Sequence, residues 1–351
     1  MVARRDGVQL ALGMEWAAGD HMPWAVLDQR LRGTEFLRVP VRTVLNGPES
    51  TGMGFWSLNP YIGCEFGCAY CYARDTHRWT MEKARGSAPD CASAYDEFER
   101  RILVKADAPE VLARTLDPAR LAGHTLVIGT ATDPYQPAER RFRLTRRLLE
   151  ALLPHRGLSI GLITKSPLVT RDLDVLASLA ERHDLTVNIS LITTDATLAR
   201  RLEARSPAPH ARLRALAALR AQGLRAGLLV MPIIPGITDG WQQLADLMAA
   251  AKEAGACYVA GGALRLGPAT RARFLPHLER EFPELAERYR RHFATSDYTS
   301  RAYSEALKRR LSALQETFGF PVEARGRGRR QVEARPQGRA QRGEVAQPTL
   351  L

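Results

Sequence analysis

Short apolar runs alternate with longer segments of helical period between residues 55 and 262. The runs are rich in β-branched residues, as strands buried on both faces are. The six strand candidates are residues 57–62, 125–130, 158–164, 186–192, 226–231 and 256–260. This alternation predicts an α/β fold in which parallel strands are covered by helices.

Four helices are expected between these strands, because Leu or Ala recurs there at spacings of three and four. Their ranges are 138–153, 173–182, 210–222 and 241–254. Gly223 and Gly255 follow two of them, where helix C-terminal caps are found. Six such units suit an incomplete TIM-like (β/α)6 barrel or an open doubly wound sheet. In both architectures the functional site lies at the C-terminal ends of the strands.

The flanking segments differ in pattern from this core, which we place at residues 54–270. Residues 1–53 show little periodicity and are predicted to form an N-terminal extension. Residues 271–322 contain two segments of helical period, 278–293 and 303–318, and are predicted to form a C-terminal helical region. Residues 323–351 are rich in Gly, Arg, Gln and Pro and cannot bury a core, so we expect a disordered basic tail.

The net charge of the chain suggests a candidate partner but does not identify it. The chain has 50 Lys and Arg against 38 Asp and Glu, a formal net charge of +12. Such an excess suits a nucleic-acid partner, because cationic side chains gain affinity by releasing phosphate counterions. Much of it lies in the Arg-rich tail, however, and not in a pattern typical of a sequence-specific reader. A nucleic acid therefore remains one candidate partner among others.

Hydropathy and cysteine usage indicate a cytoplasmic protein with no membrane partner. No apolar run is long enough to span a bilayer. The first apolar stretch, residues 10–16, is broken by Glu15 and does not resemble a signal peptide. The chain has five Cys, an odd number with three of them close together, which favours reduced thiols acting as ligands over a disulfide framework.

The three neighbouring cysteines, Cys64, Cys68 and Cys71, have the spacing C-x3-C-x2-C on the loop that follows the first predicted strand. Gly63 and Gly67 allow the backbone of this loop to curl around a bulky group. Three thiolates suit an iron–sulfur cluster, and they leave one iron of a 4Fe–4S cube without a protein ligand. That iron could bind a small molecule and transfer an electron to it.

Two other interpretations of the cysteines compete with this one. A structural zinc site usually needs four protein ligands in paired C-x2-C units, and neither His77 nor Cys91 completes a second pair. Three buried, non-ligating thiols on one glycine-punctuated loop are the second alternative. The spacing favours the cluster over both.

With Tyr70 directly before the third cysteine, the motif resembles the radical S-adenosylmethionine (SAM) superfamily. In that superfamily the open iron binds the amino and carboxylate groups of SAM. Further segments resemble the branch related to spore photoproduct lyase. They are Asn59-Pro-Tyr-Ile-Gly-Cys64, Thr132-Asp-Pro-Tyr-Gln-Pro-Ala-Glu139, Thr164-Lys-Ser166, Arg171-Asp172, Ser190-Leu-Ile-Thr193, Glu203-Ala-Arg-Ser-Pro-Ala-Pro209 and Met231-Pro-Ile-Ile-Pro-Gly236. The resemblance implies an incomplete barrel of the radical SAM type.

The resemblance also implies which residues contact SAM. They are Tyr70, Thr130, Asp133, Lys165, Ser166 and Ser190. A carboxylate such as Asp133 is a sensible partner for the SAM ammonium group. The chain departs from the family pattern in two places: the usual Gly-Gly-Glu is absent, and Ala204 stands where the family's Glu-Pro-Arg segment has proline. For Glu203 and Arg205 an exposed ion pair is an equal alternative.

The implied activity is reductive cleavage of SAM to a 5′-deoxyadenosyl radical that acts on an unidentified substrate, for which a nucleic acid is the leading class. A reductant such as ferredoxin or flavodoxin would supply electrons. No catalytic residue outside the cluster loop is identified; Cys91 and Cys257 are the spare thiols. The rival hypothesis is a nucleic-acid-binding protein that uses a metal or cluster only as a structural clip. An electron carrier is disfavoured, because no fourth cysteine lies nearby.

Overall fold

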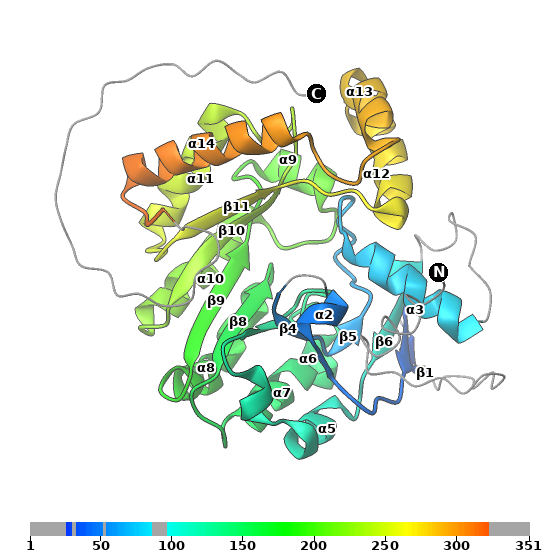
Figure 1. Ribbon diagram of the computed structural model, residues 1–351, viewed down its shortest axis with the longest axis vertical. Coiled ribbons are helices and arrows are strands. Elements are labelled where there is room, and N and C mark those ends of the chain that lie inside the picture. Colours follow the sequence, from blue (N-terminus) through cyan, green and yellow to red (C-terminus); the bar gives the residue numbers. More distant parts are fainter. Residues whose placement is uncertain (1–25, 30–32, 52–53, 86–96, 323–351) are drawn as a thin grey trace.

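Two β-sheets surrounded by helices organise the chain in the computed structural model, which describes residues 26–29, 33–51, 54–85 and 97–322 (Figure 1). The strands are β1 (Val26–Gln29), β2 (Glu35–Arg38), β3 (Leu45–Asn46), β4 (Trp56–Leu58), β5 (Tyr61–Ile62), β6 (Arg101–Val104), β7 (Thr125–Ile128), β8 (Ser159–Thr164), β9 (Asp184–Ser190), β10 (Ala226–Ile233) and β11 (Val259–Ala263). The helices are α2 (Pro48–Thr51), α3 (Ala73–Arg85), α5 (Ala108–Thr115), α6 (Glu139–Phe142), α7 (Leu144–Leu152), α8 (Leu173–Ala180), α9 (Ala196–Leu202), α10 (Pro209–Ala221), α11 (Trp241–Glu253), α12 (Pro268–Glu281), α13 (Pro283–Phe293) and α14 (Arg301–Phe318), with 3-10 turns at Pro118–Leu121 and Pro167–Asp172.

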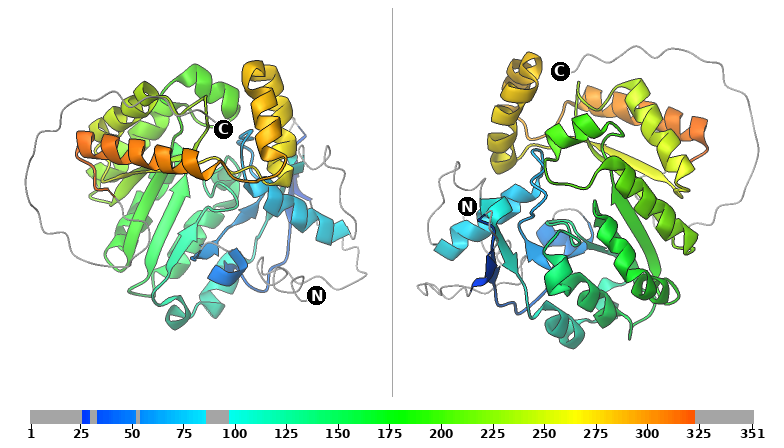
Figure 2. Two further views of the ribbon diagram at one scale, coloured as in Figure 1. Left: turned by 45° about the horizontal axis from the view of Figure 1, so that its top comes forward. Right: turned by 180° about the vertical axis from the view of Figure 1, so that it is seen from behind.

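The larger sheet has seven strands in the order β11-β10-β9-β8-β7-β4-β3. From β4 to β11 its strands are parallel and follow one another in chain order, while β3 pairs antiparallel with β4 at one edge. Parallel neighbours need right-handed crossover connections, which place the connecting helices on one face. Accordingly the connecting helices α8 and α10 pack on β9; α14, which follows the last strand, packs on β11 (Figure 2). The predicted α/β fold with a mostly parallel sheet is confirmed.

The edges of this sheet are β3 and β11, and no pairing between described residues joins them. The barrel therefore stays a prediction. The sheet's apolar side chains, including Leu126, Leu162 and Val187, belong to one large buried cluster with the covering helices.

A second sheet of four strands, β1-β2-β6-β5, was not predicted. The expected single strand at 57–62 is wrong in this respect, because the chain leaves the larger sheet after Leu58 and Tyr61–Ile62 pairs antiparallel with β6. The sequence pattern could not show this change of partner, since β5 and β6 are far apart along the chain. The cysteine loop starts directly after β5 and therefore lies beside the junction of the two sheets.

The predicted helix at 138–153 is two helices in the structure. Arg143 adopts a positive φ of 51° between α6 and α7. The Glu139 carboxylate accepts hydrogen bonds from the backbone N–H of Thr145 (3.0 Å) and Arg146 (3.3 Å). It thus satisfies amide groups that begin α7, as an N-terminal cap does. The C-terminal region likewise contains three helices, α12, α13 and α14, where two segments were expected.

Some predictions fall on residues that the structure does not describe. The basic tail at 323–351, Cys91 and the first 25 residues of the predicted N-terminal extension lie outside the described residues. Within the described ranges, no helix combines the length and the apolar character that a bilayer crossing would require.

Lys105 follows β6, and its side chain is buried. Burial lowers the pKa of its ammonium group to about 8, because desolvation disfavours the charged form. The unfolded chain keeps this proton up to about pH 10.4, so stability should rise with pH between about 8 and 10.4. We expect Lys105→Met to raise the free energy of unfolding by about 1–3 kcal/mol at pH 7 and to flatten that rise.

Urea unfolding at pH 7 and pH 9.5 measures both effects. Lys308→Met is the matched control, because Lys308 is exposed on α14. The Lys308→Met substitution should change the free energy of unfolding by no more than about 0.5 kcal/mol at either pH. A Lys105→Met variant that is less stable than wild type at pH 7 would contradict the prediction.

Candidate functional site

The three cysteines lie on a tightly curled loop after β5. Cys64 and Cys68 are buried, and Cys71 is partly exposed. Gly63 and Gly67 have φ values of 88° and 63°, a region that L-residues rarely adopt. A Cβ on Gly63 would also approach a backbone oxygen of residue 98 at 2.9 Å. The predicted role of these glycines in shaping the loop agrees with their geometry.

Side chains from the loop after β7 hold the cysteine loop in place. Gln136 donates a hydrogen bond to the Gly63 carbonyl (3.2 Å) and accepts one from the Glu65 backbone N–H (2.9 Å). Thr132 Oγ1 donates to the same carbonyl (2.6 Å). In return, the Glu65 carboxylate accepts a hydrogen bond from the Ala138 N–H (2.6 Å). The segment Thr132 to Glu139, noted in the sequence, therefore supports the cysteine loop.

A buried arginine, Arg74 of α3, supports the loop from its other end. Its guanidinium donates to the Cys68 carbonyl (3.1 Å), pairs with Glu99, and lies over the Phe98 ring at 4.7 Å. Glu99 also pairs with Arg205. Although burial raises the pKa of Glu99, the two arginines lower it overall, so this carboxylate is ionised at neutral pH.

Burial raises the pKa of all three thiols: that of Cys68 to about 12, and those of Cys64 and Cys71 above the usual thiol value. A nearby metal cation reverses this effect, because it stabilises the thiolate that binds it. Within the described ranges, no three His, Cys, Asp or Glu side chains gather closely enough for a single metal ion. A 4Fe–4S cube takes its three thiolates on three different irons, so soft donors on a supported loop suit such a group.

Next to the cysteine loop lies a buried network of charged and polar groups. The Glu203 carboxylate pairs with Arg212, accepts a hydrogen bond from the Tyr70 hydroxyl, and lies 3.3 Å from Lys165 Nζ. Lys165 Nζ also donates to Ser190 Oγ (2.8 Å). Burial alone would raise the pKa of Glu203, but the charges of Arg212 and Lys165 lower it to about 2.

These contacts bring together three of the residues expected to contact SAM, namely Tyr70, Lys165 and Ser190. Burial lowers the pKa of the Lys165 ammonium, yet Glu203, with smaller effects of Cys68 and Asp133, raises it overall. Lys165 is therefore a cation with its side chain 14% exposed, at the C-terminal end of β8. The exposed ion pair considered for Glu203 and Arg205 is wrong, because Glu203 is buried and pairs with Arg212 instead.

Asp133 is turned toward the end of β8. One carboxylate oxygen accepts hydrogen bonds from the Tyr135 N–H (2.9 Å) and from Thr164 Oγ1 (2.7 Å). The other accepts from the Lys165 N–H (2.7 Å). Asp133 thus joins the loop after β7 to the loop after β8. Its contact with SAM stays a prediction.

Thr130 and Ser166 also lie at strand ends. Thr130 Oγ1 accepts a hydrogen bond from the Asn59 side chain (3.1 Å), and its carbonyl accepts one from the Tyr72 hydroxyl. Ser166 Oγ accepts from the Leu168 N–H (3.3 Å) and caps the following 3-10 turn. Tyr72, directly after Cys71, is partly exposed beside Thr130. The backbone around Thr130 is therefore tied to the cysteine loop.

Arg212, Gln136 and Arg74 support this site but were not singled out from the sequence. In the sequence, Arg212 is one of several polar residues in a predicted helix. Its contact with Glu203 forms only when the chain folds. Gln136 lies within the segment Thr132 to Glu139, which resembles the branch related to spore photoproduct lyase. That resemblance is the signal that could have identified Gln136. Arg74 is three residues beyond the third cysteine, and nothing in its local pattern indicates burial.

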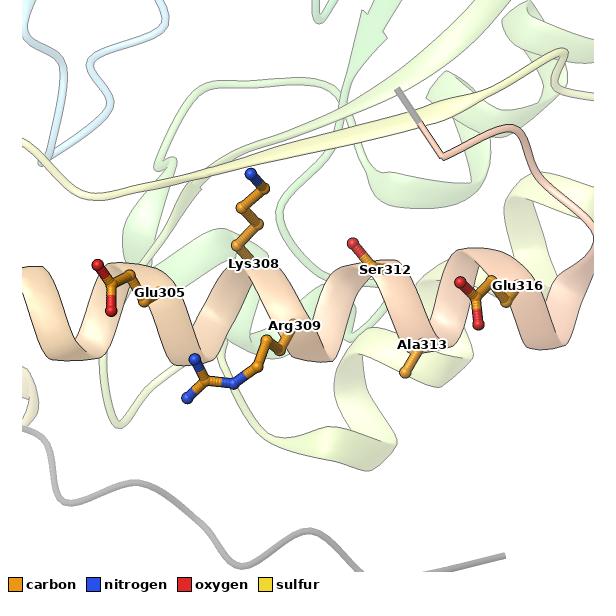
Figure 3. A pocket seen from close by; sticks show the side chains of 6 residues that line it. All are labelled: Glu305, Lys308, Arg309, Ser312, Ala313 and Glu316. Atoms are coloured by element: carbon orange, nitrogen blue, oxygen red, sulfur yellow. The ribbon is translucent and has the colours of Figure 1, made fainter. Parts of the chain in front are cut away.

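Two hollows differ in their relation to the site. One of about 440 Å³ is lined by residues of α9, the following turn and the start of α10, with Glu203, Ser206 and Arg212 among them. Another of about 450 Å³ runs along the exposed face of α14, between Glu305 and Glu316 (Figure 3). None of the residues predicted from the sequence lines this second hollow.

Comparison with known proteins agrees with this geometry. A family model described as the radical SAM superfamily matches residues 58–248. The uncharacterized protein Rv2578c of Mycobacterium tuberculosis is 34% identical over 284 residues, which are 80% of this chain and 80% of that one. The uncharacterized protein MJ0683 of Methanocaldococcus jannaschii is 26% identical over 205 residues, covering 58% of this chain and 70% of that protein.

Solved structures of spore photoproduct lyase share the fold. A single-substitution variant has a TM-score of 0.56 and 16% identity, with 85% of each chain covered. A double variant with bound AdoMet and dinucleoside spore photoproduct has a TM-score of 0.55 and 17% identity, covering 81% of this chain and 79% of that one. The resemblance inferred from the cysteine spacing is confirmed. The family match spans more than half of the chain and contains all three cysteines, so the protein belongs to the radical SAM superfamily and is an enzyme.

Proposed function

We propose that the enzyme holds a 4Fe–4S cluster on Cys64, Cys68 and Cys71 and uses it to cleave SAM reductively. The cluster, when bound, supplies an electron that breaks a carbon–sulfur bond of SAM and yields methionine and a 5′-deoxyadenosyl radical. The observation that carries the proposal is the position of the three thiols. They lie on one supported loop, directly beside the buried network of Lys165, Glu203 and Arg212.

Side chains around this loop would orient SAM. Lys165 is a partly buried cation at a strand end, suited to a carboxylate, because charge-assisted hydrogen bonds strengthen where water is excluded. Glu203 and Ser190 hold the Lys165 ammonium group in position. We assign Thr130, Asp133, Ser166 and the Tyr70 ring to the remaining SAM contacts. Because Asp133 also bonds the Lys165 backbone, it would position this lysine as well.

The proposed architecture is an incomplete barrel around SAM. The sequential order of the parallel strands supports it, because the strand ends then converge on one side. Cys257 lies away from these ends, since its N–H bonds the carbonyl of Ala226, the first residue of β10. A radical relay through Cys257 is therefore not part of the proposal. We further propose a cytoplasmic enzyme that is reduced by a ferredoxin or a flavodoxin.

A nucleic acid is the proposed substrate class. The net charge of +12 supports it, because a polyanion gains affinity from cationic side chains. One of the structural neighbours carries a dinucleoside photoproduct. Whether the enzyme is a lyase or a transferase depends on the atom that the radical attacks.

An anaerobic assay tests the proposed function. The protein is reconstituted with iron and sulfide, reduced with dithionite and mixed with SAM, and 5′-deoxyadenosine is measured. The wild type should form 5′-deoxyadenosine, while Cys68→Ala should form none above background. Cys257→Ala is the matched control and should form 5′-deoxyadenosine as the wild type does, because it removes a thiol that lies away from the cysteine loop. A wild type that assembles the cluster yet leaves SAM intact, with and without oligonucleotides, would refute the proposal.

A further inference from the structure

The end of α9 and the turn after it contact the cysteine loop directly. The Ala69 N–H bonds the carbonyl of Leu202, the last residue of α9, and the Arg205 N–H bonds the Phe66 carbonyl (3.2 Å). Just beyond α9, Ser206 Oγ lies 3.5 Å from Cys68 Sγ. The turn that contains Ser206 is therefore in direct contact with Cys68.

The 440 Å³ hollow lies on this face. Ser206 lines the hollow and also touches Cys68, so the hollow leads directly toward the cysteine loop. Cationic side chains surround it, with Arg200, Arg201 and Arg212 in its lining. Arg212 is paired with Glu203 in the interior, whereas Arg200 and Arg201 are exposed.

More arginines extend this cationic surface onto α12, which lies beside α9 (Figure 1). Arg201 and Arg280 both pair with Glu281, and their side chains are 39% and 62% exposed. Arg205, 43% exposed, pairs with Glu99. Arg280 and Arg201 also act on His277, whose pKa burial and these cations lower to about 4. Arginines therefore outnumber carboxylates here. We call the exposed set Arg200, Arg201, Arg205 and Arg280 the α9–α12 arginine face.

Reductive cleavage of SAM consumes one electron, which must enter from outside the site. We propose that the α9–α12 arginine face docks a small acidic electron-transfer protein, of the flavodoxin or ferredoxin type, that reduces the cluster; this inference rests on the proposed function. One electron leaves the reduced donor and one electron enters the cluster, with no bond or proton exchanged. Arginine forks suit carboxylates on the donor, and such complementary charge guides association of proteins.

Position favours an electron donor over a nucleic acid as the occupant. The inner lining of the hollow consists of the buried side chains of Glu203, Ser206 and Arg212, and Ser206 Oγ lies 3.5 Å from Cys68 Sγ. A substrate would have to displace these side chains to reach the site. An electron, in contrast, can cross them without any displacement.

The test separates docking from SAM chemistry. The double variant R200E/R280E reverses two exposed charges of the α9–α12 arginine face and spares every residue that holds the cysteine loop. The control R225E/R301E reverses two arginines that are 57% and 93% exposed elsewhere: Arg225 precedes β10, and Arg301 begins α14. All proteins are reconstituted full chains. Binding of oxidised flavodoxin and of oxidised ferredoxin is measured by calorimetry, and 5′-deoxyadenosine is measured with each donor and, separately, with dithionite.

We expect R200E/R280E to raise the Kd for the donor at least about tenfold and to slow donor-driven product formation equally, with dithionite-driven formation unchanged. Higher salt should weaken wild-type binding and reduce the difference. Equal Kd values in wild type and variant, an equal loss in the control, a wild type that binds neither donor, or a face that binds single-stranded oligonucleotide instead would each overturn the inference. Failure with dithionite in the wild type would instead refute the proposed function.

Discussion

The Glu203→Leu substitution is expected to lower the free energy of unfolding by about 3–5 kcal/mol, because removing one partner of a buried ion pair leaves the other charge uncompensated. Arg212 is 1% exposed on its side chain and Lys165 is 14% exposed, so neither cation can regain much water. The Tyr70 hydroxyl would also lose its acceptor. Urea unfolding of the reduced apoprotein, monitored by circular dichroism, measures the change.

Two comparisons show whether the unpaired charge causes this loss. Adding Arg212→Met to Glu203→Leu removes the stranded guanidinium, so the double variant should be more stable than Glu203→Leu alone. Glu287→Leu removes a carboxylate of α13 that is 64% exposed and pairs with Arg290. It should cost at most about 1 kcal/mol. A loss for Glu203→Leu no larger than that for Glu287→Leu would show that the buried network does not stabilise the fold.

The Gly129→Ala substitution should destabilise the enzyme by more than about 3 kcal/mol, because strain and overlap add at one position. Gly129 has a φ of 95°, between β7 and the loop that supports the cysteines. A Cβ there would overlap the backbone oxygen of Ile163 and lie 2.8 Å from Cδ of Pro134. Both of these atoms belong to residues packed at this end of the sheet, so neither can shift to make room for a Cβ.

Gly123→Ala is the matched control for this substitution. Gly123 also has a positive φ, 77°, but a Cβ there meets nothing within 4 Å. It should therefore cost only the conformational penalty of about 1–2 kcal/mol. Thermal and urea unfolding of both variants compare them. If both lose the same stability, the overlap at Gly129 contributes nothing, and the close packing of the loop after β7 would have to be reconsidered.

The sequence predicted those features that local pattern or spacing encodes. Buried strands such as β8 and β9 show as apolar runs, and the cysteine spacing alone indicated a cluster loop. The pairing of Lys165 with Ser190 joins two predicted strand ends, which parallel neighbours bring together. The α/β fold and the membership of the radical SAM superfamily were accessible for these reasons.

Contacts between segments that are distant along the chain could not be predicted from the sequence. The pairing of β5 with β6 depends on partners far apart in the chain, so the second sheet and the end of β4 at Leu58 were missed. Arg143 interrupts a continuous helical pattern at a point where the Glu139 carboxylate, which also accepts a hydrogen bond from Tyr61 (2.5 Å), bonds the first amides of α7. The hydrogen bonds of Asp133 to the end of β8 also join separate segments of the chain, so they too could not be predicted.

The contacts that close over the cysteine loop come from late parts of the chain, which bears on how the enzyme matures in the cell. The Ala69 N–H bonds the Leu202 carbonyl, and the Cys71 carbonyl accepts a hydrogen bond from Thr270 (3.0 Å). A ribosome makes the three thiols long before either segment. During synthesis the loop therefore lacks both of these contacts until residues 202 and 270 have been added to the chain.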